Sequence, residues 1–157
     1  MSDISERKNK MLKILFVCHG NICRSPMAEF VMRQMLEQRE IDNVLTESAG
    51  TSSEELGNPV HSGTARILRR LGIDYSGKRA RQITKSDYDE FDLIVGMDSA
   101  NIRNMERFWG DPQNKIRLLL SDRDVADPWY TGDFERTYAD IREGCEKLVT
   151  TVMERIQ

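Results

Sequence analysis

The sequence predicts an α/β fold, in which a four-stranded parallel sheet is flanked by helices on both faces. Two observations predict it. The first is a set of short apolar runs of strand length. The second is that these runs alternate along the chain with segments whose apolar residues recur at helical spacing. Such alternation is typical of right-handed crossovers between parallel strands, and it places helices on both faces of the sheet. The chain has 157 residues, which is enough for one domain with a sizeable core.

The first strand is expected at residues 12–17, an apolar run followed closely by Gly20 and Asn21. Both residues tolerate the dihedral angles of a tight loop. A helix is expected next, with Ser25 as its N-cap and Pro26 at the first helical position. Strand, loop and helix start therefore form one continuous unit.

The remaining elements keep the alternation of strand and helix. Further strands are expected at residues 43–49, 92–97 and 115–120, and helices at residues 60–71, 84–91 and 98–109. Thr84 is the expected cap of the second of these helices, together with Asp87 three residues later. The last helix has the clearest apolar stripe of the chain, formed by Phe134, Tyr138, Ile141, Cys145, Leu148, Val149 and Val152. That stripe predicts a core helix.

With four strands, the expected order is 2-1-3-4, a short version of the flavodoxin-like arrangement. We assign residues 11–157 to one domain and expect the polar residues 1–10 to be a flexible leader. Ligands of such sheets bind beyond the carboxyl ends of the strands, at the point where the strand order reverses. That point lies beside the first strand, where the loop containing Cys18 begins.

Composition and charge exclude several classes of protein. The net charge of -3 argues against a nucleic-acid-binding protein, which would need a basic excess. The apolar run at residues 11–18 is far too short to cross a bilayer, so we expect no membrane insertion. Three cysteines do not form a disulfide framework, and their odd number suits the reducing cytoplasm.

The loop after the first strand combines a cysteine with an anion site. A helix N-terminus preceded by a glycine-containing loop offers backbone N–H groups and the positive end of the helix dipole. Cys18 faces that field, which favours the nucleophilic thiolate. Arg24 presents a planar fork of donors that suits phosphate oxygens. A lone cysteine that ends a strand is more often a buried apolar residue, but this combination favours a catalytic thiol.

A metal site is the weaker interpretation of the same cysteines. Cys18 and Cys23 are five residues apart, and only Cys145, His19 and His61 remain as further sulfur or imidazole ligands. No second ligand pair at metal spacing is present. We therefore expect neither a metal nor a cofactor.

The loop sequence CHGNICRSPMAE at residues 18–29 resembles the signature C-x5-R-[ST] of the low-molecular-weight protein tyrosine phosphatases. The resemblance extends to SAGT at 48–51, ARQIT at 80–84, GMDSAN at 96–101 and DPWY at 127–130. It covers nearly the whole chain after the polar leader. The fold of that family, a four-stranded parallel sheet between helices, agrees with the elements above.

The resemblance implies a reaction and its catalytic residues. Cys18 would be the nucleophile that forms a phosphocysteine, Arg24 would hold the phosphate, and Asp127 would be the general acid and then the general base. From the sequence pattern alone, an Asp before a Pro is more often a turn former. The implied activity is that of a cysteine-dependent phosphotyrosine-protein phosphatase, a hydrolase of aryl phosphate monoesters.

The resemblance also implies roles for residues around these three. Substrate-binding residues would be His19, Gly20, Asn21, Ile22, Cys23, Ser25, Trp129 and Tyr130, and supporting residues would be Ser48, Asp98 and Asn101. Ser25 would donate a hydrogen bond to the sulfur of Cys18, and Asn21 would hold the loop with Ser48 as its partner. Trp129 and Tyr130 would form an aromatic wall.

The implied partner is a phosphotyrosine-containing protein, with an autophosphorylating tyrosine kinase as one candidate. Such a kinase is also a candidate to phosphorylate Tyr130. We expect a monomer or a weak dimer. Cys23 is a candidate redox partner that captures oxidised Cys18 as a disulfide; simple packing in the loop is its equally weighted alternative.

Three other functions remain as alternatives. Arginine phosphatases of the same family resemble this chain, but their residue before the second loop cysteine is typically threonine, and Ile22 favours phosphotyrosine. Arsenate reductases share the fold and loop, but they need further cysteines, and none lies between Cys23 and Cys145. A non-catalytic phosphate-binding module would have lost Cys18, Arg24 or Asp127.

Two departures from animal members of the family concern the substrate. Animal members often have an aromatic residue in the loop after the second strand, where this chain has Glu54 and Glu55. They also have a histidine near the position of Leu71 that supports the loop asparagine. Basic residues beside the phosphotyrosine are therefore one hypothesis for the substrate.

Overall fold

The computed structural model describes residues 11–156, so the predicted leader at residues 1–10 lies outside the described residues. Its centre is one sheet of four parallel strands in the order β2-β1-β3-β4. These strands are β1 (Leu12–Cys18), β2 (Val44–Gly50), β3 (Leu93–Gly96) and β4 (Ile116–Leu118). The predicted fold class and strand order are confirmed.

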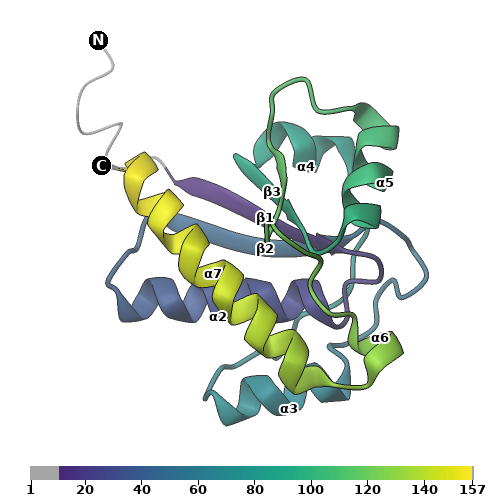
Figure 1. Cartoon of the computed structure of the whole chain (residues 1–157), viewed down its shortest axis with the longest axis vertical. Helices are drawn as coiled ribbons and strands as arrows, with labels where there is room; N and C mark the ends of the chain where they lie inside the picture. The colour runs from purple at the N-terminus through teal and green to yellow at the C-terminus, as the bar shows by residue number, and fades with distance from the viewer. Residues whose placement is uncertain (1–10, 157) are drawn as a thin grey trace.

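Helices cover both faces of this sheet (Figure 1). The described helices are α2 (Arg24–Gln38), α3 (Ser62–Arg70), α4 (Lys85–Glu90), α5 (Ser99–Trp109), α6 (Pro128–Thr131) and α7 (Phe134–Ile156). The helices α2 and α7 pack together over one face, with α3 against both, while α4 and α5 lie over the other. Within residues 11–156, no helix combines the length and apolar character that a bilayer crossing requires.

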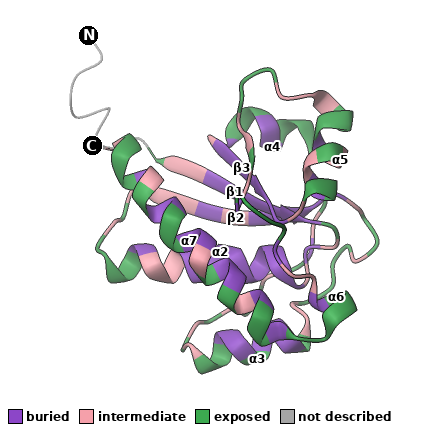
Figure 2. Ribbon diagram, viewed as in Figure 1, coloured by how far each residue is buried: buried purple, intermediate pink, exposed green. Residues whose placement is uncertain are grey.

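The alternation of side chains along β1 produces a core on each face. Ile14 and Phe16 point into the larger apolar cluster with α2 and α7, and Leu15 and Val17 point into the smaller one with α4 and α5. Figure 2 shows the central strands as almost entirely buried. A strand covered on both faces is expected to be uniformly apolar, which explains why this run could be recognised in the sequence.

The beginning of α2 differs from the sequence prediction. The helix begins at Arg24, and Cys23 occupies the N-cap position without a side-chain hydrogen bond. The prediction of Ser25 as N-cap is therefore wrong. The physical reason is that the hydroxyl of Ser25 lies beside the sulfur of Cys18 and the amide of Asn21, so it is not available to the helix end.

Other boundaries also shift by one or two residues. The helix predicted at residues 60–71 begins at Ser62, because the ring of His61 accepts a hydrogen bond from the N–H of Gly63 and caps it. The capping box of Thr84 and Asp87 is confirmed. The short helix α6 was not predicted from the sequence. Its four residues follow Asp127, and such a length carries no detectable apolar period.

Candidate active site

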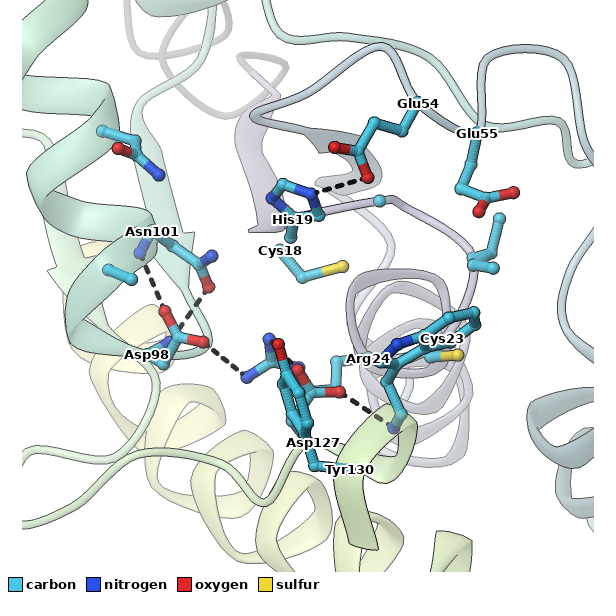
Figure 3. Close-up of a pocket in the computed structure, with 15 residues that line it drawn as sticks. Cys18, His19, Cys23, Arg24, Glu54, Glu55, Asp98, Asn101, Asp127 and Tyr130 are labelled. Atoms are coloured by element: carbon cyan, nitrogen blue, oxygen red, sulfur yellow. Dashed lines mark hydrogen bonds and ion pairs between the residues drawn. The ribbon is translucent and has the colours of Figure 1, made fainter. Parts of the chain in front are cut away.

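The loop between β1 and α2 lies at the carboxyl end of the sheet and forms the floor of a cleft of about 510 Å³ (Figure 3). Of the predicted site residues, the cleft is lined by Cys18, His19, Gly20, Ile22, Cys23, Arg24, Asp98, Asn101, Asp127, Trp129 and Tyr130. The fold therefore brings together side chains from β1, the loop, α5 and the segment around α6. β1 ends at this edge of the sheet, and α5 and α6 begin there.

Cys18 is almost completely buried at the floor of the cleft, and its sulfur has two polar neighbours. The N–H of Asn21 donates to it at 3.3 Å, and the hydroxyl of Ser25 lies 3.0 Å away. Asn21 has a φ of 60°, in the left-handed region, and this conformation turns its N–H toward the sulfur. Donors of this kind stabilise negative charge on sulfur.

The side chain of Asn21 lies beneath the loop and not in the cleft. Its amide group donates to the hydroxyls of Ser25 at 2.8 Å and Ser48 at 2.9 Å, and its oxygen accepts from the N–H of Arg81 at 3.0 Å. The predicted contact between Asn21 and Ser48 is therefore present. Asn21 and Ser25 were predicted to bind substrate, but neither side chain lines the cleft, and both support the loop from below.

The end of β2 passes very close to this loop. A Cβ atom added to Gly50 would lie 2.7 Å from the backbone oxygen of His19, so only glycine fits there. The N–H groups of Thr51 and Ser52 donate to the oxygens of Cys18 and His19 at 2.9 and 3.1 Å. Residues 50–52, at the end of β2 and just after it, thus hold the outer side of the loop.

A buried charged pair extends the support beneath the loop. The hydroxyl of Ser48 donates to the carboxylate of Glu29 at 2.6 Å, and the ammonium of Lys78 lies 3.5 Å from that carboxylate. Lys78 also donates to the backbone oxygen of Ser48 at 2.9 Å. Burial lowers the pKa of Lys78, and attraction to Glu29 opposes that shift. No sequence pattern predicted this pair. Leu71, near which animal members of the family have a histidine that supports the loop asparagine, packs against the apolar core.

Arg24 is held between two carboxylates at the side of the cleft (Figure 3). Its guanidinium lies 2.9 Å from Asp98 and 3.2 Å from Asp127, and it donates to the backbone oxygen of Val125 at 3.2 Å. Burial lowers the pKa of Arg24, but the negative charges of Cys18, Asp127 and Asp98 outweigh it and raise the pKa overall. The guanidinium is therefore a permanent cation in the cleft.

Asp98 has two functions in the structure. One carboxylate oxygen accepts the N–H of Asn101 at 2.8 Å as the N-cap of α5, and Asn101 completes a capping box with the N–H of Asp98. The other oxygen lies against Arg24. A helix cap thus orients the guanidinium.

Asp127 reaches the cleft from a segment 103 residues after Arg24. One of its carboxylate oxygens accepts the N–H of Trp129 at 3.1 Å, which begins α6, and the other faces Arg24. Trp129 and Tyr130 are 66% and 85% exposed at the mouth of the cleft. A carboxylate, a thiol and a guanidinium therefore meet in one cleft with exposed aromatic rings beside it.

Comparison with known proteins agrees with this geometry. The sequence model of the family described as low molecular weight phosphotyrosine protein phosphatase matches residues 13–157. The chain belongs to this family. A curated relative, the low molecular weight protein-tyrosine-phosphatase YfkJ of Bacillus subtilis, is 42% identical over 94% of this chain and 99% of its own length.

Solved structures of relatives have the same fold. The crystal structure of YfkJ superimposes with a TM-score of 0.90 over 94% of this chain and 98% of that one, at 40% identity. SP-PTP, a low molecular weight protein tyrosine phosphatase from Streptococcus pyogenes, gives 0.82 at 46% identity over 90% and 93% of the two chains. The Drosophila arginine phosphatase DARP gives 0.82 at 28% identity over 90% and 98%. The family thus includes structures named for two different phosphorylated side chains.

On the side of the cleft opposite Asp127, this family member has an acidic rim (Figure 3). Glu54 lies 3.1 Å from the ring of His19, and both side chains are largely exposed. Glu55 lies against Gly20. Glu54 and Glu55 are not among the predicted site residues, although the family resemblance already connected their loop with the substrate, and the structure places both at the cleft.

Cys23 also lines the cleft, as a neutral thiol. Burial raises its pKa to about 12, and the negative charges of Cys18 and Asp127 add to this shift. Cys23 is therefore a poor nucleophile at neutral pH. Within residues 11–156, no group of three His, Cys, Asp or Glu side chains is placed to hold a metal ion.

Proposed function

We propose that this family member is a protein tyrosine phosphatase that hydrolyses phosphotyrosine through a phosphocysteine on Cys18. The observation that carries the proposal is the meeting of Cys18, Arg24 and Asp127 in one cleft, although Asp127 is 103 residues from Arg24. These residues supply the three parts that the reaction needs: a nucleophile, a phosphate clamp and an acid.

In the first step, the thiolate of Cys18 attacks phosphorus, so an S–P bond forms as the P–O bond to the aryl group breaks. Arg24 binds two of the phosphoryl oxygens and offsets the charge of the transition state. Asp127 transfers its proton to the departing phenolate oxygen. Tyrosine leaves as a neutral phenol, which lowers the barrier relative to an unprotonated leaving group.

In the second step, water replaces the thiolate at phosphorus. Asp127, now ionised, removes a proton from the water, and the S–P bond breaks as the new P–O bond forms. The products are inorganic phosphate and free Cys18. The hydroxyl of Ser25, 3.0 Å from the sulfur, stabilises the departing thiolate.

The aromatic rings at the mouth favour an aryl phosphate. Trp129 and Tyr130 offer flat surfaces on which a phenyl ring packs. Ile22, a loop residue that lines the cleft, favours phosphotyrosine over phosphoarginine because its apolar side chain suits a ring and not a guanidinium. Phosphoarginine is the second candidate substrate, since DARP of the same fold is named an arginine phosphatase.

The partner of this activity is a phosphotyrosine-containing protein in the cytoplasm, and an autophosphorylating tyrosine kinase is the candidate we favour. Such a kinase would also find Tyr130 accessible, because its ring is 85% exposed. Arsenate reduction is a weaker proposal, since the relay needs a further cysteine and Cys145 lies in the core.

A redox response is a further part of this proposal. Peroxide would convert the thiolate of Cys18 into a sulfenic acid, and Cys23 would then displace water to form a disulfide. The negative charge of Cys18 is one cause of the raised pKa of Cys23, and that cause disappears once the sulfenic acid has formed. Oxidation of Cys18 therefore makes Cys23 a better nucleophile.

The test is hydrolysis of p-nitrophenyl phosphate, a phosphotyrosine peptide and a phosphoarginine peptide of matched sequence, in the presence of a metal chelator. We expect activity without metal and a higher kcat/KM on the phosphotyrosine peptide. A higher kcat/KM on the phosphoarginine peptide would identify phosphoarginine, and not phosphotyrosine, as the preferred substrate. No hydrolysis of any of the three would contradict a phosphatase function.

A further inference from the structure

The backbone of the segment that carries Asp127 forms hydrogen bonds with several elements that are distant in the sequence. The N–H of Val125 donates to the oxygen of Met97 at the end of β3, at 2.8 Å. The backbone oxygen of Val125 accepts from Arg24 at 3.2 Å. Residue 125 is thereby attached to the sheet and to the start of α2.

The next residue, Ala126, is held entirely by side chains of α7. Its N–H donates to a carboxylate oxygen of Asp140 at 2.9 Å, and its backbone oxygen accepts the hydroxyl of Thr137 at 2.8 Å. Thr137 and Asp140 are three residues apart on the helix, so they lie on the same face. Thr137 is completely buried, and Asp140 is 9% exposed.

The second oxygen of Asp140 is held by Arg123. The guanidinium donates to it at 2.9 Å and contacts Glu143 at 3.1 Å. Arg123 is 41% exposed, so this ion pair adds little stability by itself. Its effect is to fix the orientation of the carboxylate that binds Ala126.

We propose that Thr137 and Asp140 are positioning residues that place the carboxylate of Asp127 for proton transfer. The inference rests on the proposed function. Asp127 is held by Arg24 and by the N–H of Trp129. A phosphoryl group bound to Arg24 competes for the first of these contacts. The attachment of Ala126 to α7 does not depend on substrate, so it fixes Asp127 during the reaction.

Proton transfer is sensitive to this placement. An acid must come within about 2.6–3.2 Å of the oxygen that it protonates. A displacement of about 1 Å can lower the rate by about 10²-fold. Loss of either hydrogen bond to Ala126 lets the adjacent Asp127 move relative to the sulfur of Cys18. Thr137 and Asp140 have no hydrogen bond with the loop, so the defect should concern mainly proton transfer.

The test compares Thr137→Val with Thr137→Ser, because valine removes the hydroxyl while keeping the size and serine keeps the hydroxyl. Thr151→Val is the matched control. It removes a hydroxyl of the same helix that contacts only the backbone of Lys147, at 3.4 Å. kcat/KM is measured for aryl phosphates whose leaving groups range from p-nitrophenol to phenol.

We expect Thr137→Val to lower kcat/KM for phenyl phosphate by about 10-fold and for p-nitrophenyl phosphate by about 2-fold, because p-nitrophenolate leaves without a proton. Thr137→Ser and Thr151→Val should keep the wild-type dependence on the leaving group. An equal loss for all leaving groups, or a full loss in Thr137→Ser, would assign Thr137 a purely structural role and overturn the proposal.

Asp140→Asn provides a second variant that keeps the size of the side chain. However the amide is oriented, either Ala126 or Arg123 then loses an acceptor, so a smaller defect with the same dependence on the leaving group is expected. If Thr137→Val does not fold, Asp140→Ala, which removes both acceptors, decides, and a wild-type dependence there overturns the proposal. Absence of aryl phosphatase activity in the wild type would instead refute the proposed function.

Discussion

The loop of residues 18–24 and the segment of residues 125–127 reach the same cleft by different means. The polar contacts of the Cys18 sulfur come from near neighbours in the sequence, the N–H of Asn21 and the hydroxyl of Ser25, while β2 and Arg81 hold the loop from outside. The segment is held by residues far from it, on β3, α2 and α7. The comparison indicates that the proposed nucleophile and anion site are formed by consecutive residues, while the proposed acid reaches them only through contacts between distant elements.

Removing the nucleophile should have the largest effect. We expect Cys18→Ser to reduce phosphatase activity to an undetectable level, because a serine hydroxyl has no nearby base to ionise it. Binding of inorganic phosphate, measured by calorimetry, should persist, since Arg24 and the backbone donors of the loop remain. Measurable turnover in Cys18→Ser would mean that the local loop is not the source of the nucleophile.

Glu29 and Lys78 support the loop from beneath, although they are far from it or from each other in the sequence. Lys78→Met removes the cation beside the buried Glu29, and we expect a loss of about 2 kcal/mol in the free energy of unfolding. Urea denaturation measures this loss. Glu29 also contacts Arg33 at 2.8 Å and accepts from the hydroxyl of Ser48 at 2.6 Å, so the carboxylate retains two partners.

A double variant tests whether Lys78 acts through Glu29. Adding Glu29→Gln to Lys78→Met should cost less than the sum of the two single changes. Additive losses would show that the two side chains are energetically independent.

The two cysteines of the loop should differ in their reaction with iodoacetamide. Because burial and nearby negative charge raise the pKa of Cys23 to about 12, its thiol stays protonated at neutral pH and reacts only as the pH approaches that value. Alkylation followed by mass spectrometry from pH 6 to 10 should label Cys18 first at every pH. Asp127→Asn should speed labelling of Cys23 slightly, since it removes one of the charges. Equal labelling of both cysteines at pH 7 would contradict the raised pKa.

The acidic rim should have the smallest effect. We expect Glu54→Lys to change kcat/KM by about 2- to 5-fold for peptides with a basic residue beside the phosphotyrosine, because exposed charges interact weakly in water. p-Nitrophenyl phosphate, which has no flanking residue, is the control substrate. An unchanged ranking of basic and acidic peptides would exclude this rim as a determinant of peptide preference.

The strands and the loop of residues 18–24 could be predicted from the sequence, but the contacts between residues far apart in the chain could not. The strands could be predicted because β1 and β3 are buried on both faces, which leaves continuous apolar runs. The loop could be predicted because its residues are consecutive. Asp127 looked like a turn residue, and only the family resemblance gave it a role. The contacts of Lys78 with Glu29 and of Thr137 with Ala126 join residues whose distance in the sequence hides their contact.

The most direct test of the two-region account is rapid-quench kinetics of Asp127→Asn with p-nitrophenyl phosphate. The intact loop should still transfer the phosphoryl group to Cys18, because p-nitrophenolate needs no acid, but water should then lack its base. We predict a burst of p-nitrophenolate equal to the enzyme concentration, slow turnover afterwards, and one phosphoryl group on Cys18 by mass spectrometry. Absence of a burst, or a phosphoryl group on another residue, would contradict the division of the reaction between the loop and the segment around Asp127.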